Sequence, residues 1–124
     1  MTRERGLKRL WRRLFRSCCP PPPAGVTGLS AGPSAGSGEV QVTWTPHPDS
    51  RVEWYRLYRS ELAGGPYDHA YLVENAPSPV LPGLYGVLEI GVAVRRYYRV
   101  SAVTDDGREG PISAEASGAP VGVP

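Results

Sequence analysis

Histidines, acidic residues and cysteines are the side chains here that could carry chemistry, and none falls in a pattern that would support it. His47 and His69 lie far apart in the sequence, whereas a metal site needs three or four convergent ligands. No serine occupies a strand–turn–helix nucleophile motif, and no glycine loop precedes a helix as phosphate binding requires. We therefore expect no catalytic residue, no metal site, no cofactor and no small-molecule substrate.

Three acidic residues, Asp105, Asp106 and Glu109, crowd one short segment. They could serve as a carboxylate pair or as calcium ligands. However, Asp106–Gly107 is common turn chemistry, and the acids do not follow the ligand spacing of a calcium loop. The segment is predicted to be a solvated hairpin loop.

Aromatic and arginine side chains recur at alternate positions of the predicted strands. Trp54, Arg56 and Tyr58 fall on one face by the period of two, and Arg99 belongs to another strand. Such side chains dominate the binding energy of many protein interfaces. We hypothesise that these four form a partner face; alternatively, the rings cover a sheet edge or pack under the arginines. Other candidates for this face are Tyr67, Tyr71 and Tyr97.

The first nineteen residues differ in charge from the rest of the chain. Residues 1–19 hold seven basic residues and one acidic residue, whereas residues 20–124 hold seven and eleven. Apolar residues in this segment recur at helical spacing: Leu7, Leu10, Trp11, Leu14 and Phe15. This pattern predicts a basic amphipathic anchor helix over 1–19. A polyproline spacer, Pro20–Pro23, then holds it away from the body.

Several partners fit this predicted anchor helix. It could bind a groove of a protein in a larger assembly, a membrane surface through residues 3–16, or, less favoured, nucleic acid. It could also be a disordered, solubilising tail. The adjacent Cys18 and Cys19 cannot join the two sheets of a domain, but they would be acylation candidates beside a membrane-bound helix.

The sequence lacks the usual export and membrane signals. The apolar residues of the first segment are interrupted by arginines, so it has no signal-peptide core. No apolar stretch approaches the ~20 residues of a spanning helix. A virion or intracellular setting is therefore favoured over classical secretion.

Short segments with a period of two indicate an all-β domain over residues 24–117, followed by a tail over 118–124. The alternation of Val40, Val42 and Trp44 and that of Tyr98, Val100 and Ala102 are the clearest. The seven expected strands are Gly25–Ala31, Val40–Thr45, Val52–Ser60, His69–Val73, Leu84–Ile90, Arg95–Thr104 and Ile112–Ala116. An antiparallel sandwich is predicted, with core residues Val42, Trp44, Tyr55, Leu57, Tyr98, Val100 and Ala102.

Three segments in order resemble fibronectin type III domains. EVQVTWTP (39–46) is similar to the second strand of that family, WYRLYRSELAGGPY (54–67) to the third strand and its turn, and RYYRVSAVTDDGREGPIS (96–113) to the sixth strand and beyond. The resemblance implies a seven-stranded immunoglobulin-like sandwich. One position departs from the family pattern. Arg96 stands where the family usually has a tyrosine that forms a corner between the sixth strand and the preceding loop. Either Tyr97 takes over that role or the corner is missing.

The resemblance also implies a function. Such domains space or bind other molecules, so we expect a non-enzymatic structural or interaction module that its N-terminal helix anchors to a larger assembly. A phage virion accessory or decoration component would have this organisation. The alternative is a peripheral membrane-associated adhesion or signalling module.

Overall fold

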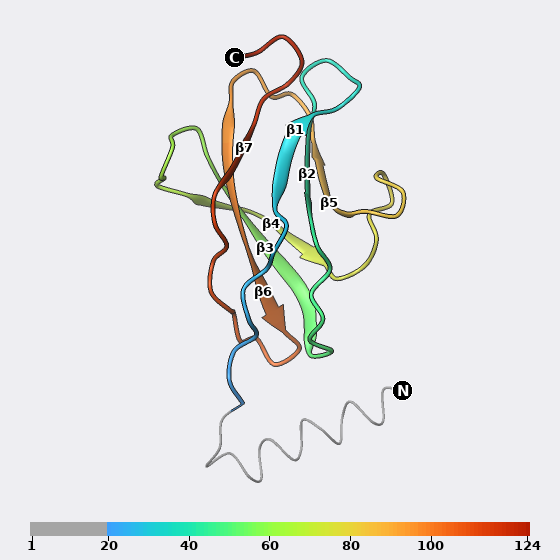
Figure 1. Ribbon diagram of the computed structural model, residues 1–124, viewed down its shortest axis with the longest axis vertical. Helices are drawn as coiled ribbons and strands as arrows, with labels where there is room; N and C mark the ends of the chain where they lie inside the picture. Colours follow the sequence, from blue (N-terminus) through green and yellow to red (C-terminus); the bar gives the residue numbers. More distant parts are fainter. Residues whose placement is uncertain (1–19) are drawn as a thin grey trace.

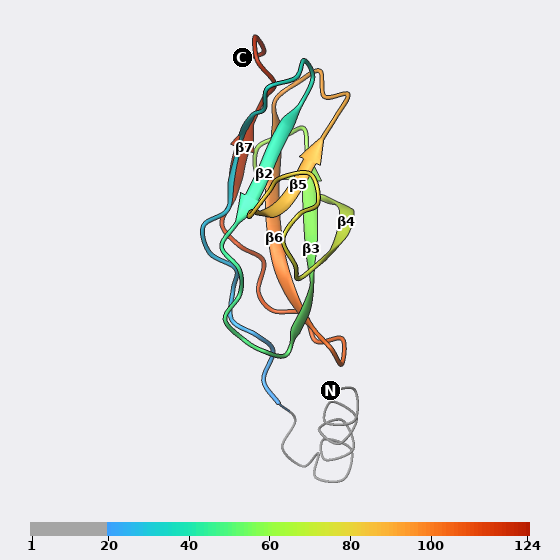
Figure 2. The same ribbon diagram turned by 90° about the vertical axis from the view of Figure 1, so that its right-hand side faces the viewer.

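The computed structural model of the protein describes residues 20–124. The predicted anchor helix with Leu7, Leu10, Trp11, Leu14 and Phe15, together with Cys18 and Cys19, lies outside the described residues. The described chain forms two antiparallel sheets that face each other (Figures 1 and 2). One contains β1 (Ser30–Pro33), β2 (Val40–Trp44) and β5 (Tyr85–Glu89), and the other contains β4 (Asp68–Glu74), β3 (Val52–Ser60), β6 (Arg96–Thr104) and β7 (Ala116–Gly118). The predicted seven-stranded sandwich is confirmed.

The core lies between the two sheets and follows the alternation of the strands. On β3, Tyr55 and Leu57 are fully buried. Trp54 and Arg56, which alternate with them along the strand, are exposed. All seven predicted core residues are buried: Val42, Trp44, Tyr55, Leu57, Tyr98, Val100 and Ala102. No disulfide crosses this core, since no described residue is a cysteine.

The strands at both ends of the domain begin later than predicted. Strand β1 starts at Ser30 rather than Gly25, because Gly28 turns the chain with a φ of 72°. The last strand is Ala116–Gly118 rather than Ile112–Ala116. Pro111 has no amide donor, so the chain before β7 is an irregular connection rather than a regular strand.

Strand β6 is buried on both faces over much of its length, which its sequence did not predict. Ser101 is fully buried and Val103 is 5% exposed, although alternation places both away from the core. The cause is the returning chain, since Glu109 forms an isolated bridge with Val103. Gly110 N also donates to Ala102 O (2.8 Å). The connection from β6 to β7 thus covers the end of the sheet.

Two residues of the polyproline spacer contact the sandwich. Pro23 is fully buried, and Arg51 Nη1 donates to Pro21 O (2.8 Å). Gly110 lies so close to the backbone of Pro23 that a Cβ there would collide with its carbonyl oxygen. The first described residues emerge at the end of the sandwich opposite to the C terminus (Figure 1).

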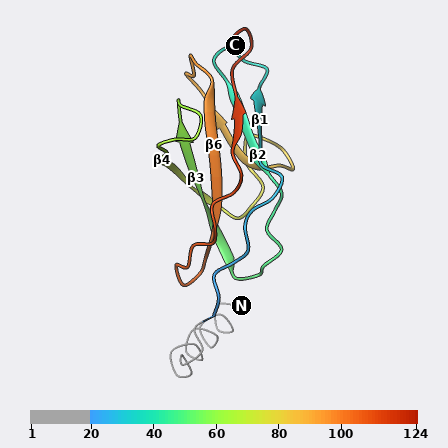
Figure 3. The ribbon, with the colours of Figure 1, turned by 60° about the vertical axis from the view of Figure 1, so that its left-hand side comes forward.

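Strands β1 and β7 close one side of the sandwich. They belong to different sheets but lie side by side (Figure 3). A Cβ on Gly118 would lie 2.8 Å from backbone atoms of Ala31 and Gly32, so only glycine permits this approach. The edge strands on the other side are therefore β4 and β5.

The position at which the chain departs from the resemblance, Arg96, lies beside the buried carboxylate of Glu89. Arg96, the departing residue, forms an ion pair with Glu89 (Nη1 to Oε1, 3.2 Å). Tyr98 Oη donates to the same oxygen (2.6 Å). Arg96 and Tyr98 thus both bind the end of β5, and Tyr97 does not supply this contact.

Candidate functional site

The structure brings the four residues of the predicted partner face together on the outside of the larger sheet. In the register of β3 and β6, Tyr58 is opposite Arg99 and Arg56 is opposite Ser101, so Arg56 and Arg99 are diagonal neighbours. Trp54 is 36% exposed, Arg56 is exposed, and Tyr58 and Arg99 are half-buried. We call Trp54, Arg56, Tyr58 and Arg99 the β3–β6 face.

Glu109 organises the centre of the β3–β6 face. Its carboxylate accepts hydrogen bonds from Tyr58 Oη (2.5 Å), from Arg56 Nη1 (3.1 Å) and from the hydroxyl of Ser101. Burial alone would raise the pKa of Glu109, but the hydrogen bonds from Ser101 and Tyr58 and the charge of Arg56 hold it below its ordinary value. Glu109 is therefore a fixed anion that orients two side chains of the face.

The sequence analysis missed this role of Glu109. It predicted a solvated loop together with Asp105 and Asp106, but the Glu109 side chain is only 27% exposed and lies on the face. Its partner Tyr58 is 51 residues away in the chain. No local pattern signals such a contact, because it depends on how the connection after β6 folds back over the sheet.

Arg99 is held by an aromatic ring. Its guanidinium lies over Tyr67, with Cζ 5.1 Å from the ring centroid, and the hydroxyl of Tyr67 donates to Glu115. Arg99 Nε is buried and makes no hydrogen bond within the described residues. This contact agrees with the alternative expectation that some rings pack under arginines.

Strand β4 extends the β3–β6 face with apolar surface. The His69 ring packs edge-on against Tyr58, with centroids 5.8 Å apart, and Leu72, opposite Arg56, is 53% exposed. Tyr71 does not belong to the face, because its hydroxyl donates to Glu89 (2.9 Å) on the other side of the sheet. Large rings and arginines are the side chains that contribute most of the binding energy at many protein interfaces.

Within 20–124, no three His, Cys, Asp or Glu side chains gather as metal ligands. His47 braces a loop, since its Nε2 lies 2.8 Å from Ala24 O and its Nδ1 accepts from Asp49 N (3.0 Å). Over the same range, no helix is long and apolar enough to cross a membrane.

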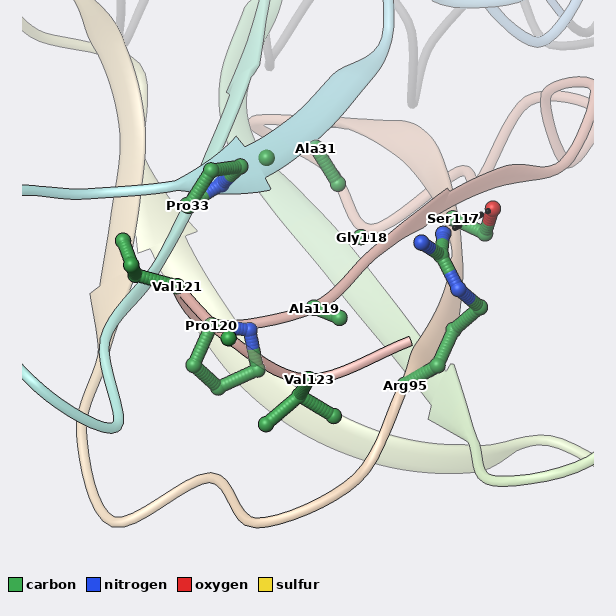
Figure 4. Close-up of a pocket in the computed structure, with 11 residues that line it drawn as sticks. Ala31, Pro33, Arg95, Ser117, Gly118, Ala119, Pro120, Val121 and Val123 are labelled. Carbon is green, nitrogen blue, oxygen red and sulfur yellow. Dashed lines mark hydrogen bonds between the residues drawn. The ribbon is translucent and has the colours of Figure 1, made fainter.

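A cavity of about 400 Å³ lies beside the C-terminal segment (Figure 4). Its walls come from β1, β7 and residues 119–123, and most of them are Gly, Ala, Pro and Val. Arg95 is the only charged residue that lines it, and Arg95 Nη1 donates to Ser117 Oγ (3.1 Å). A small-molecule site generally has several convergent polar groups, so this cavity is a weaker candidate than the β3–β6 face.

Comparison with known proteins gives closely related folds. No family model matches the sequence. The crystal structure of an Fn3-like protein from Clostridium thermocellum is 30% identical, with a TM-score of 0.65 over 84% of this chain and 99% of that chain. The sixth fibronectin type III domain of human fibronectin type III domain containing protein 3 is 24% identical, with a TM-score of 0.58 over 84% and 92% of the two chains.

One curated relative is much longer than this chain. An amylopullulanase from Thermoanaerobacter thermohydrosulfuricus is 33% identical over 98 residues, which cover 79% of this chain and 6% of that protein. The similarity therefore concerns one small part of the enzyme, of the size of the sandwich described here.

Proposed function

Because the chain belongs to the fibronectin type III family, we propose that it is a non-enzymatic interaction module that binds a partner protein through the β3–β6 face. This fold is generally a non-catalytic module, commonly used for interaction or structural roles.

The observation that carries the proposal is the fixed geometry of the face. Glu109 holds Arg56 and Tyr58, and Tyr67 supports Arg99 from below. Side chains that are ordered before binding lose less conformational entropy when a partner arrives. A rigid aromatic and arginine surface is therefore better suited to binding than an equally exposed but mobile one.

The face also indicates the chemistry of its partner. Leu72 and Trp54 offer apolar area. Arg99 presents a positive charge, and its guanidinium contacts an aromatic ring rather than a carboxylate of the described residues. A protein surface with an apolar or aromatic group beside a carboxylate would complement both. We propose such a surface as the partner.

A photo-crosslinking amino acid placed in the full chain tests the face. One variant carries it at Leu72, beside the face, and the matched control carries it at Val80, which is 60% exposed in the β4–β5 connection. The proposal expects one dominant protein adduct from position 72 and none from position 80. Equal adducts from both positions, or none from position 72, would contradict it.

We propose further that residues 1–19 anchor the module to a larger assembly. In the favoured case this assembly is a phage virion, and the protein is an accessory or decoration component of it. The support is their charge and helical spacing, together with the spacer that packs on the sandwich at Arg51 and Gly110. Deleting residues 1–19 should leave a folded sandwich that no longer enters the assembly. If the truncated chain still co-sedimented with particles, the anchor would be contradicted. If the full chain floated with anionic vesicles, the membrane alternative would be supported instead.

A second candidate function is suggested by the amylopullulanase relative, in which a similar segment belongs to a polysaccharide-acting enzyme. The module would then bind a glucan as an accessory domain, with Trp54 as the stacking ring. Affinity electrophoresis in gels containing pullulan tests this. Retarded migration that Trp54→Ala abolishes would support the glucan role, and unchanged migration would exclude it for pullulan.

A further inference from the structure

Glu89 is a buried carboxylate that the proposed function does not use. It is the last residue of β5 and is 2% exposed. Its backbone is paired with Val40 of β2, so it belongs to the smaller sheet. Its side chain, however, reaches across to the larger sheet at the side where β4 and β5 are the edge strands.

Four donors from three strands of the larger sheet converge on this carboxylate. Oε1 accepts from Tyr98 Oη (2.6 Å) and Arg96 Nη1 (3.2 Å). Oε2 accepts from Tyr71 Oη (2.9 Å) and from the Arg59 guanidinium. One side chain of β5 is thus joined to β3, β4 and β6.

We propose that Glu89 is an acid-sensitive clasp: protonation of its carboxylate releases the β4–β5 side of the sandwich while the β1–β7 side stays closed. The two sides differ in what holds them. Strands β1 and β7 approach through the small backbone of Gly118, which does not titrate. Strands β4 and β5 meet through an ionised group.

Charge explains why protonation would open this side. The titratable groups that face Glu89 are Arg59 from β3, Tyr71 from β4, and Arg96 and Tyr98 from β6. A neutral carboxyl would leave two arginines without their shared anion. Arg96 is the more affected, because its side chain is 17% exposed and its other carboxylate partner, Glu61, is 3.9 Å away and largely exposed.

The pKa of Glu89 fixes the direction of the effect. Burial would raise it, but the hydrogen bonds from Tyr98 and Tyr71 and the charge of Arg59 hold it below the ordinary value of 4.5. A depressed folded pKa means that the clasp is fully formed above the unfolded value and is lost as the pH falls through the folded value. The β4–β5 side is therefore closed at neutral pH and opens only in acid.

Hydrogen–deuterium exchange of the full chain, expressed as protection factors at several pH values, tests the clasp. In the wild type, acidification should lower the protection factors of β4 and β5 about tenfold more than those of β7. A tenfold change is expected when the pH is one unit below the pKa of the carboxylate. In Glu89→Gln, β4 and β5 should already be poorly protected at pH 7, with no further fall in acid.

Two further variants make the outcome decisive. Glu115→Gln removes a carboxylate whose partners are Tyr67 and Gly64, and it should keep the wild-type pH profile. If Glu89→Gln does not fold, Tyr71→Phe removes one donor and should move the opening to higher pH by about 0.5–1 unit. Uniform loss of protection in all strands, or an unchanged profile in the Glu89→Gln or Tyr71→Phe variant, would overturn the proposal.

Discussion

Tyr58 Oη donates a hydrogen bond to Glu109 Oε2 over 2.5 Å, and this contact joins the middle of β3 to the connection that follows β6. The same carboxylate binds Arg56. A residue that the sequence places in a polar loop therefore determines the conformation of the proposed binding face. Changes at Glu109 should alter the face without removing any of its own side chains.

Replacing Glu109 with glutamine removes the charge and keeps the size. We expect a loss of about 1–3 kcal/mol in the free energy of unfolding, because the donors on Tyr58, Arg56 and the fully buried Ser101 lose a shared anion. Urea denaturation followed by tryptophan fluorescence measures it. Glu74→Gln, an exposed residue of β4, is the control and should stay within about 0.5 kcal/mol. Equal effects of the two variants would show that Glu109 does not hold the face.

Truncating a core leucine should cost much more than truncating a surface leucine on the neighbouring strand. Leu57 is fully buried, whereas Leu72 on β4 is 53% exposed. Leu57→Ala is expected to destabilise the domain by about 2–5 kcal/mol through lost burial and a residual cavity. Leu72→Ala should cost less than about 1 kcal/mol. Similar midpoints for the two variants in urea would contradict the assigned faces of β3 and β4.

Two glycines should differ sharply in their tolerance of alanine. A Cβ on Gly86 would collide with the carbonyl oxygen of Val42 and lie 2.8 Å from Thr43 Cα, while one on Gly32 would meet nothing within 4 Å. Gly86→Ala should therefore destabilise by about 1–3 kcal/mol or prevent folding, as expected for overpacking. Gly32→Ala should be close to neutral. A stable Gly86→Ala domain would show that β2 and β5 pack less tightly than described.

The ion pair beside the spacer should be visible in the titration of Asp49. Hydrogen bonds from the Arg51 side chain and backbone lower the pKa of Asp49 from 3.8 to about 2. Because the folded pKa is depressed, the pair stabilises the domain above the unfolded value and loses this effect as the pH falls toward 2. Carboxyl carbon shifts in NMR report the titration. Arg51→Ala should raise the pKa toward 3.8, and an unshifted pKa would contradict the pairing.

Much of the fold could be predicted from the sequence, because a strand with one buried face has a local signature. The alternation around Trp44 and around Tyr98 depends only on neighbouring residues and on the period of two. The bounds of β3, which contains Tyr55 and Leu57, were predicted exactly as observed. The four residues of the face also follow from alternation once β3 and β6 are neighbours.

Other features depend on contacts between distant segments, so the sequence could not reveal them. Glu109 looked like a loop residue because its partners lie on β3 and β6. Glu89 looked like the end of an ordinary strand, although its side chain is surrounded by donors from the opposite sheet. Pro23 looked like part of a free spacer, but it is buried where its backbone closely approaches Gly110. Each depends on a tertiary environment that no local period encodes.

The most direct test of the proposed binding face is the dissociation constant for the partner recovered by crosslinking at position 72. The measurement is isothermal titration calorimetry with the full chain and with a Trp54→Ala/Arg99→Ala double variant. Loss of two such anchors should weaken binding by about 30-fold or more, since each is expected to contribute at least about 1 kcal/mol. Ile90→Ala, which truncates a 74% exposed side chain away from the face, should change it less than about twofold. If the double variant bound as tightly as the Ile90→Ala control, the β3–β6 face would not be the binding surface.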